Sequence, residues 1–91
     1  MSTGSHAITV YSRHGCHLCS DAEAIVARVC ELHGADWTRV DVDADPNEAL
    51  RYGDHVPVVV LDGRIIAYWT LSPDVLDRAL RGEQVPALPD L

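Results

Sequence analysis

The fold is decided by residues 11–19, which read Y-S-R-H-G-C-H-L-C. A short β-branched run, Ala7 to Tyr11, leads into this stretch and predicts a strand. From Cys16 onward, apolar residues recur at steps of three and four, which predicts a helix with one apolar face that ends at Gly34. The members of this predicted face are Leu18, Ala22, Ile25, Val29 and Leu32. The stretch therefore predicts a strand, a loop over Ser12–Gly15 and a helix that starts at the first of two cysteines.

The position of Cys16 at a helix start predicts a reactive thiol. The first backbone N–H groups of a helix lack internal partners, and the helix dipole adds about half a positive charge there. Both effects stabilise a thiolate, and first cysteines of C-x-x-C motifs at helix starts have pKa values of roughly 3.5–7.5, against ~8.5 for a free cysteine. Arg13, His14 and His17 add positive charge nearby when the histidines are protonated. We therefore expect Cys16 to be an exposed nucleophile.

Cys19 follows Cys16 by one helical turn, so both side chains face the same side. A small adjustment of this arrangement reaches disulfide geometry. The sequence therefore predicts Cys19 as the more sheltered resolving thiol, which attacks a mixed disulfide on Cys16 and releases the reduced target. Cys30 lies about 16 Å further along the helix axis, too far for a disulfide with either. We expect Cys30 to be a small buried hydrophobic residue.

The rest of the chain alternates further strands and helices. The expected elements are a strand over Trp37–Val42, a turn over Asp43–Asn47, a short helix from Pro46 to about Tyr52, strands over Pro57–Leu61 and Arg64–Trp69 joined by the hairpin signal Asp62-Gly63, and a helix from Ser72 to Gly82. The order β-α-β-α-β-β-α predicts an α/β fold with a single mixed four-stranded sheet and helices on its faces. We expect one domain over residues 1–91, with its core at about 7–81 and a C-terminal tail at 83–91.

Composition excludes several classes of partner. The 91-residue chain carries 14 acids and 7 arginines, has no lysine and has a net charge of −7, so it lacks the basic surface that nucleic acids and anionic membranes require. The apolar stretch Val56–Leu61 is far shorter than the ~20 residues that span a bilayer. Met1–His6 contains no pattern typical of a secretory signal. We expect a cytoplasmic protein that acts as a monomer.

Two motifs together resemble a known family. The stretch Y-S-R-H-G-C-H-L-C and the stretch V-P-V-V-V-L-D-G at residues 56–63 resemble the glutaredoxin-like branch of the thioredoxin superfamily, in particular its small C-x-L-C members, over about residues 7–81. The resemblance implies a thioredoxin fold with a cis peptide bond at Val56–Pro57, next to the cysteine pair. It also implies that the Val56 backbone binds an incoming peptide or thiol as a short antiparallel strand.

The same resemblance has implications for glutathione binding. Arg13 occupies the place where glutaredoxins often bind the glycine carboxylate of glutathione. Ala67-Tyr68 and Thr70 replace the glycine pair and the aspartate that hold its γ-glutamyl end, and the added side chains fill space that these contacts need. A protein disulfide and another low-molecular-weight thiol therefore fit as well as glutathione.

The function predicted from the sequence is a dithiol thiol–disulfide oxidoreductase that reduces protein or low-molecular-weight disulfides. The catalytic residues are Cys16 and Cys19, and the substrate contacts are Arg13, His17, Val56 and Pro57. We expect no cofactor beyond the redox-active disulfide, with glutathione or another small thiol as a candidate co-substrate and a protein or thiol as reductant.

Two alternatives stay open. One is a metal- or iron–sulfur-binding module on the same fold, with Cys16 and Cys19 joined by a histidine, Cys30 or a second subunit. The other is an interaction domain without catalysis. Outside the motifs, we expect Asp41–Asp45 to be a solvated turn, His55 to be exposed, and Trp69 to pack at a strand end.

Overall fold

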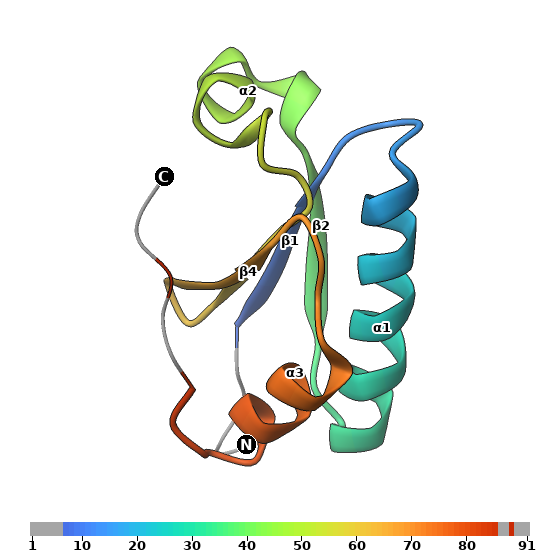
Figure 1. Ribbon diagram of the computed structural model, residues 1–91, viewed down its shortest axis with the longest axis vertical. Helices are drawn as coiled ribbons and strands as arrows, with labels where there is room; N and C mark the ends of the chain where they lie inside the picture. Colours follow the sequence, from blue (N-terminus) through green and yellow to red (C-terminus); the bar gives the residue numbers. More distant parts are fainter. Residues whose placement is uncertain (1–6, 86–87, 89–91) are drawn as a thin grey trace.

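Four strands form one mixed sheet in the order β2-β1-β3-β4 in the computed structural model, which describes residues 7–85 and Leu88 (Figure 1). The strands are β1 (Ile8–Ser12), β2 (Trp37–Asp41), β3 (Val58–Leu61) and β4 (Arg64–Tyr68). Strand β1 pairs parallel with β2 and antiparallel with β3, and β3 pairs antiparallel with β4. This sheet confirms the predicted α/β architecture. The expectations for Met1–His6, and those for the tail at residues 86, 87 and 89–91, lie outside the described residues.

Local signals explain where the helices begin and end. They are α1 (His17–His33), the 3-10 helix η1 (Val42–Ala44), α2 (Pro46–Tyr52) and α3 (Pro73–Leu80). Proline occupies the first position of α2 and of α3, where its missing N–H costs nothing. Gly34 ends α1 in the left-handed region, at φ 65°. The predicted helices are confirmed, and η1 occupies part of the stretch that we expected to be a plain turn.

Helices α1 and α3 cover one face of the sheet, and α2 lies at one end of it (Figure 1). Between the sheet and the two long helices lies the main aliphatic core, which includes Val10, Val26, Val59 and Leu76. The opposite face of the sheet carries a smaller cluster of Val42, Tyr52, Val58 and Ile65. Leu88 packs against this smaller cluster, and its N–H donates to the carbonyl of Ile65 at 2.8 Å.

The buried face of α1 differs from the predicted one. Its buried residues are Cys19, Ala22, Val26, Val29 and Cys30. Leu18 and Leu32, which we expected on the apolar face, are 45% and 77% exposed. The two faces share Ala22 and Val29 and are rotated by a fraction of a turn. This rotation turns Cys19 toward the protein interior.

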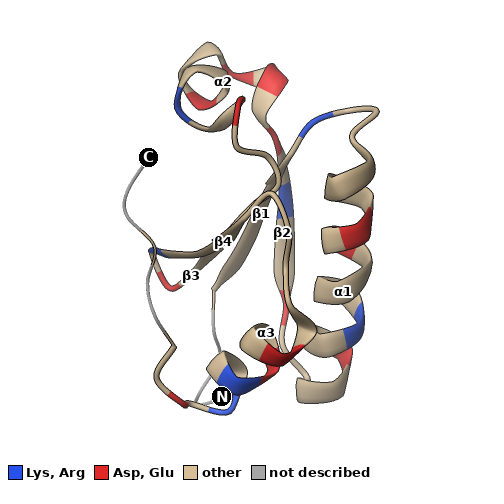
Figure 2. Ribbon diagram, viewed as in Figure 1, with Lys and Arg blue, Asp and Glu red and all other residues tan. Residues whose placement is uncertain are grey.

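Several chain segments with polar and sulfur side chains meet at one end of the sheet. Because β1 and β2 run parallel, they end together, with Ser12 paired to Asp41. Strand β3 runs the other way and starts at Val58, which pairs with Tyr11. The loops that follow β1 and β2 and the loop that precedes β3 therefore lie side by side. Figure 2 shows acidic residues around η1 and α2 at this end. Across the described residues, no helix has the length and apolar character needed to cross a membrane.

Candidate active site

The two cysteines of the C-x-x-C motif lie at the start of α1. Cys16 is the N-cap residue and Cys19 belongs to the first turn, and the two form a disulfide with Cα atoms 5.1 Å apart. The backbone N–H of Cys19 donates a hydrogen bond to the Cys16 sulfur at 3.1 Å. The Cys16 sulfur thus occupies the position where capping side chains normally accept a helix N–H group.

The two sulfur-bearing residues differ in their access to solvent. Cys19 is 1% exposed, whereas Cys16 is partly exposed. A shallow pocket of about 180 Å³ beside the disulfide is lined by Gly15, Cys16, His17 and Ser20. His17, a predicted substrate contact, is exposed on the first turn of α1. A molecule that approaches from solvent therefore meets Cys16 and His17 before it meets Cys19.

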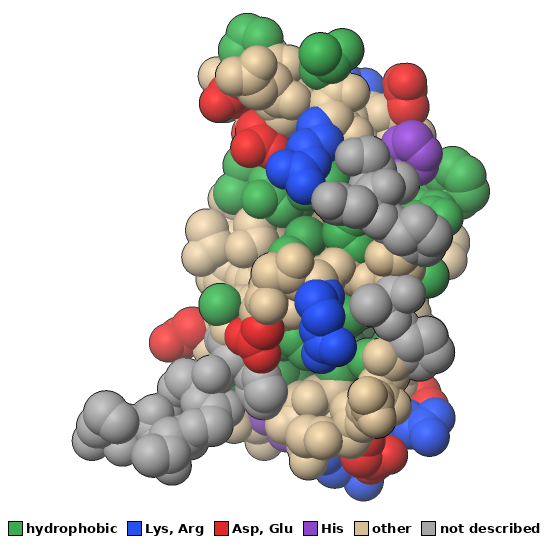
Figure 3. All heavy atoms as spheres, turned by 90° about the vertical axis from the view of Figure 1, so that its left-hand side faces the viewer, with side chains coloured by type: hydrophobic (Ala, Val, Ile, Leu, Met, Phe, Trp, Pro, Cys, Tyr) green, Lys and Arg blue, Asp and Glu red, His purple; other side chains and the backbone are tan. Residues whose placement is uncertain are grey.

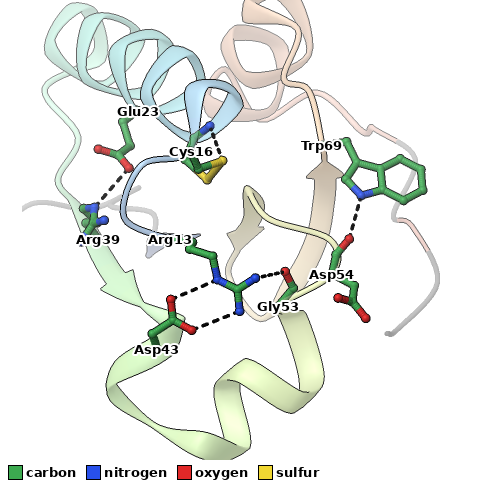
Figure 4. Close-up of a disulfide and its surroundings, with 9 residues drawn as sticks. Arg13, Cys16, Glu23, Arg39, Asp43, Gly53, Asp54 and Trp69 are labelled. Carbon is green, nitrogen blue, oxygen red and sulfur yellow. Dashed lines mark hydrogen bonds and ion pairs between the residues drawn. A yellow bond between two sulfur atoms is a disulfide. The ribbon is translucent and has the colours of Figure 1, made fainter.

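Arg13 links three segments of the site. Its Nε and Nη2 atoms donate to the two carboxylate oxygens of Asp43, each at 3.0 Å, and Nη1 donates to the Gly53 carbonyl at 3.1 Å. The hydrogen bonds with Asp43 raise the pKa of the Arg13 guanidinium. Figure 4 shows the side chain extending from the loop before Cys16 toward these two partners. Arg13 therefore connects the cysteine loop to η1 and to the loop that leads into β3.

The peptide bond between Val56 and Pro57 is cis, as the resemblance implied. It lies directly before β3, at the same end of the sheet as the cysteine loop. Pro57 is buried and Val56 is partly exposed. Across residues 7–85 and 88, neither the N–H nor the C=O group of Val56 has a hydrogen-bond partner. Both groups are thus unpaired within the described residues.

Three aromatic side chains cluster around this bend, and we call His55, Tyr68 and Trp69 the aromatic cluster. The rings of His55 and Trp69 are stacked, with centroids 5.5 Å apart and an interplanar angle of 10°. Tyr68 meets both rings edge-on, at 5.6 Å and 4.9 Å. Trp69 is 50% exposed, so it packs on its neighbours and still presents much of its surface to solvent.

The sequence pattern predicted no role in the site for Asp43, Gly53 or Trp69. A signal for Asp43 was present, because it follows β2 as Arg13 follows β1, and parallel neighbouring strands end together. The hairpin signal alone carried none for Trp69, because a regular register would place residue 68 opposite Pro57. A β-bulge between Val59 and Val60 shifts the pairing, so Val58 pairs with Tyr68 and residue 69 lies next to Pro57.

Cys30 lies apart from the disulfide of Cys16 and Cys19. Cys30 is buried in the main core, and burial, followed by the charge of Asp36, raises the pKa of its thiol. Within the part of the chain that the structure describes, no group of three or more His, Cys, Asp or Glu side chains is placed to hold a metal ion.

Comparison with known sequences shows the family of this chain. Residues 7–81 match the family described as "Glutaredoxin-like domain (DUF836)". Uncharacterized proteins of Mycobacterium tuberculosis and Mycobacterium bovis are 33% identical to this chain over 70 residues, which cover 71% of this chain and 72% of each relative.

Solved structures of other proteins have the same architecture. A structural genomics target protein from X. campestris is 28% identical with a TM-score of 0.68, over 85% of this chain and 99% of that one. A mutant thioredoxin from Halobacterium salinarum NRC-1 is 26% identical with a TM-score of 0.65, over 90% of this chain and 79% of that one. Because the family match extends from β1 through α3 and these structures share the fold, the chain belongs to the glutaredoxin-like domain family and has a thioredoxin fold.

Proposed function

We propose that this protein is a dithiol thiol–disulfide oxidoreductase that reduces disulfides of proteins or small molecules. One observation carries the proposal: Cys16 caps α1, its sulfur accepts the Cys19 N–H, and it is bonded to a partner that is shielded from solvent. Hydrogen bonding to the helix N–H group and the helix dipole favour the thiolate of Cys16 in the reduced protein. The family membership supports a redox role.

The reaction proceeds in two exchange steps. The Cys16 thiolate attacks one sulfur of the target disulfide, forms a mixed disulfide and displaces the other target sulfur as a thiolate. The Cys19 thiolate then attacks the Cys16 sulfur, restores the Cys16–Cys19 disulfide and releases the second target thiolate. Two electrons pass from the dithiol to the target, and the two protons of the dithiol end on the target thiols through solvent. An external thiol or reductase returns the protein to the dithiol state.

Substrate binding in this proposal uses the open backbone groups of Val56 beside Pro57, which suit an extended segment that pairs as an antiparallel strand. His17 lies next to the nucleophile, and Arg13 holds the surrounding loops through Asp43. Direct contact of Arg13 or His17 with substrate stays a prediction. The proposal needs no bound cofactor, describes a monomer, and includes a cytoplasmic location because thiol reductants are abundant there.

Three single substitutions test the proposal. Cys16→Ser is expected to abolish reduction of a model disulfide, because the nucleophile is lost. Cys19→Ser is expected to accumulate a mixed disulfide on Cys16, detected by mass spectrometry, because the second step cannot occur. Cys30→Ala, which removes a buried sulfur remote from the pair, serves as the matched control and is expected to keep activity. Equal rates for wild type and Cys16→Ser would refute the assignment.

Metal content separates the proposal from the alternative that the sequence left open. Protein purified without added metal is expected to contain no stoichiometric zinc or iron. Near-stoichiometric metal that is lost in a Cys16→Ala, Cys19→Ala double variant would favour the metal-binding function instead.

A further inference from the structure

One member of the aromatic cluster, Trp69, has a backbone conformation that bulky residues rarely adopt. Trp69 has φ 68°, and the Thr70 N–H bonds to the Tyr68 carbonyl at 2.8 Å, which closes a γ-turn around Trp69. Bulky residues rarely adopt a positive φ, and such conformations concentrate at binding and catalytic sites. The turn directs the indole across His55 rather than into the sheet.

Hydrogen bonds fix Trp69 to the loop that precedes β3. Its backbone N–H donates to the carbonyls of Pro57 at 3.0 Å and His55 at 3.3 Å, and the indole Nε1–H donates to the carbonyl of Asp54 at 3.2 Å. The open groups of Val56 lie between these anchoring residues in the chain. Figure 4 shows the indole beside Asp54, at the end of the molecule that carries the disulfide. Figure 3 shows hydrophobic side chains reaching the surface next to a histidine toward one end of the molecule.

The charge at this end is strongly negative. Residues 41–54 contribute five carboxylates, on Asp41, Asp43, Asp45, Glu48 and Asp54. Two guanidinium groups, on Arg13 and Arg51, oppose them. The Arg13 guanidinium is already paired with both carboxylate oxygens of Asp43. An anionic ligand such as glutathione therefore meets excess negative charge, whereas a cationic ligand meets complementary charge.

We infer that Trp69, together with Asp54, binds a lysine or arginine side chain of the substrate, and that the physiological substrates are disulfides in basic polypeptide segments. An exposed indole is the strongest of the aromatic partners for a cation, and Arg and Lys bind its face. The carboxylate of Asp54 is exposed nearby and adds attraction that salt screens. In this inference, the Val56 backbone pairs with the basic substrate segment. The aromatic cluster binds a substrate side chain next to the substrate's disulfide. This inference rests on the proposed function for the reaction itself.

The experiment compares three disulfide peptides that differ only in the residue next to the cysteine. That residue is Arg, Leu or Glu. With the wild-type protein at low salt, kcat/KM is expected to be at least tenfold higher for the Arg peptide than for the Glu peptide, with Leu between them. Trp69→Ala and Asp54→Asn are each expected to reduce this ratio to threefold or less, and 0.5 M NaCl to lower it in the wild type. Trp69→Gly removes the ring and suits the positive φ, so it covers the case in which Ala disturbs the turn.

A second measurement separates the binding inference from the reaction. Affinities of the same peptides with Ser in place of Cys are measured by calorimetry on the full chain, and the order Arg, Leu, Glu is expected. Leu32→Ala removes an exposed apolar side chain at the far end of α1 and is expected to leave the ratio and the affinities unchanged. Equal turnover and equal binding of the Arg and Glu peptides would overturn the inference. Selective binding of the Arg peptide without any disulfide reduction would uphold it and refute the proposed function instead.

Discussion

Gly53→Ala tests whether the link between Arg13 and the loop before β3 is tightly packed. Gly53 has φ −55°, a conformation that alanine adopts easily. On backbone entropy alone, the substitution would stabilise the protein by about 0.4–1 kcal/mol. A Cβ at this position, however, overlaps the backbone carbonyl oxygen of Ala49 and lies 2.9 Å from Nη2 of Arg13. Overpacking of this kind costs about 1–3 kcal/mol, so the steric effect exceeds the entropic gain.

The expected net result is a destabilisation of about 1–2 kcal/mol, which lowers Tm by roughly 4–16 °C in a domain of this size. Thermal and urea unfolding followed by circular dichroism measure it. In an Arg13→Ala background the loss is expected to shrink, because one of the two close contacts is gone, but not to vanish, because the Ala49 carbonyl remains. A Tm equal to or above that of wild type would show that the loop yields freely and would refute the reasoning.

Two further predictions concern the packing of α3. Leu76→Ala is expected to cost about 2–5 kcal/mol in urea unfolding, because Leu76 is fully buried in the main core; a loss below about 1 kcal/mol would contradict that packing. The hydrogen bond from His33 Nε2 to Asp77, 2.7 Å long, lowers the pKa of Asp77, so the ionised carboxylate stabilises the fold above its ordinary pKa of about 3.9. This stabilisation is expected to disappear as pH falls through the lowered pKa. Between pH 7 and 3, the urea unfolding midpoint should therefore fall less in Asp77→Asn than in wild type. An equal fall of the midpoint in both proteins would contradict this prediction.

Local signals made most of the fold predictable. Asp62 and Gly63 adopt φ 51° and 85°, the positive values that the hairpin signal requires, and such turns depend on little outside themselves. The buried face of α1 was less predictable, because two overlapping apolar stripes run along the helix. Packing against the sheet selects the stripe that contains Cys19 and Val26, whereas the sequence pattern favoured the one that contains Leu18.

The candidate site, like the fold, has parts that the sequence predicts and parts that depend on tertiary structure. The cysteine pair is encoded within four residues, so its placement at the helix start followed from the sequence. The partner of Arg13 is thirty residues away along the chain, and only the strand order brings Asp43 beside it. The positive φ of Trp69 has no counterpart in local propensity, which disfavours it for a bulky side chain.

The burial of Cys30 separates this thiol from the disulfide that the other two cysteines form. Exchange with the disulfide requires a thiolate that reaches it. Cys30 is buried in the core, and burial raises the pKa of its thiol, which disfavours the thiolate. Incorrect pairing of the sulfurs is therefore coupled to global opening of the molecule. Under the proposed function, repeated oxidation and reduction are therefore expected to leave the native connectivity intact, because mispairing would require the core to open.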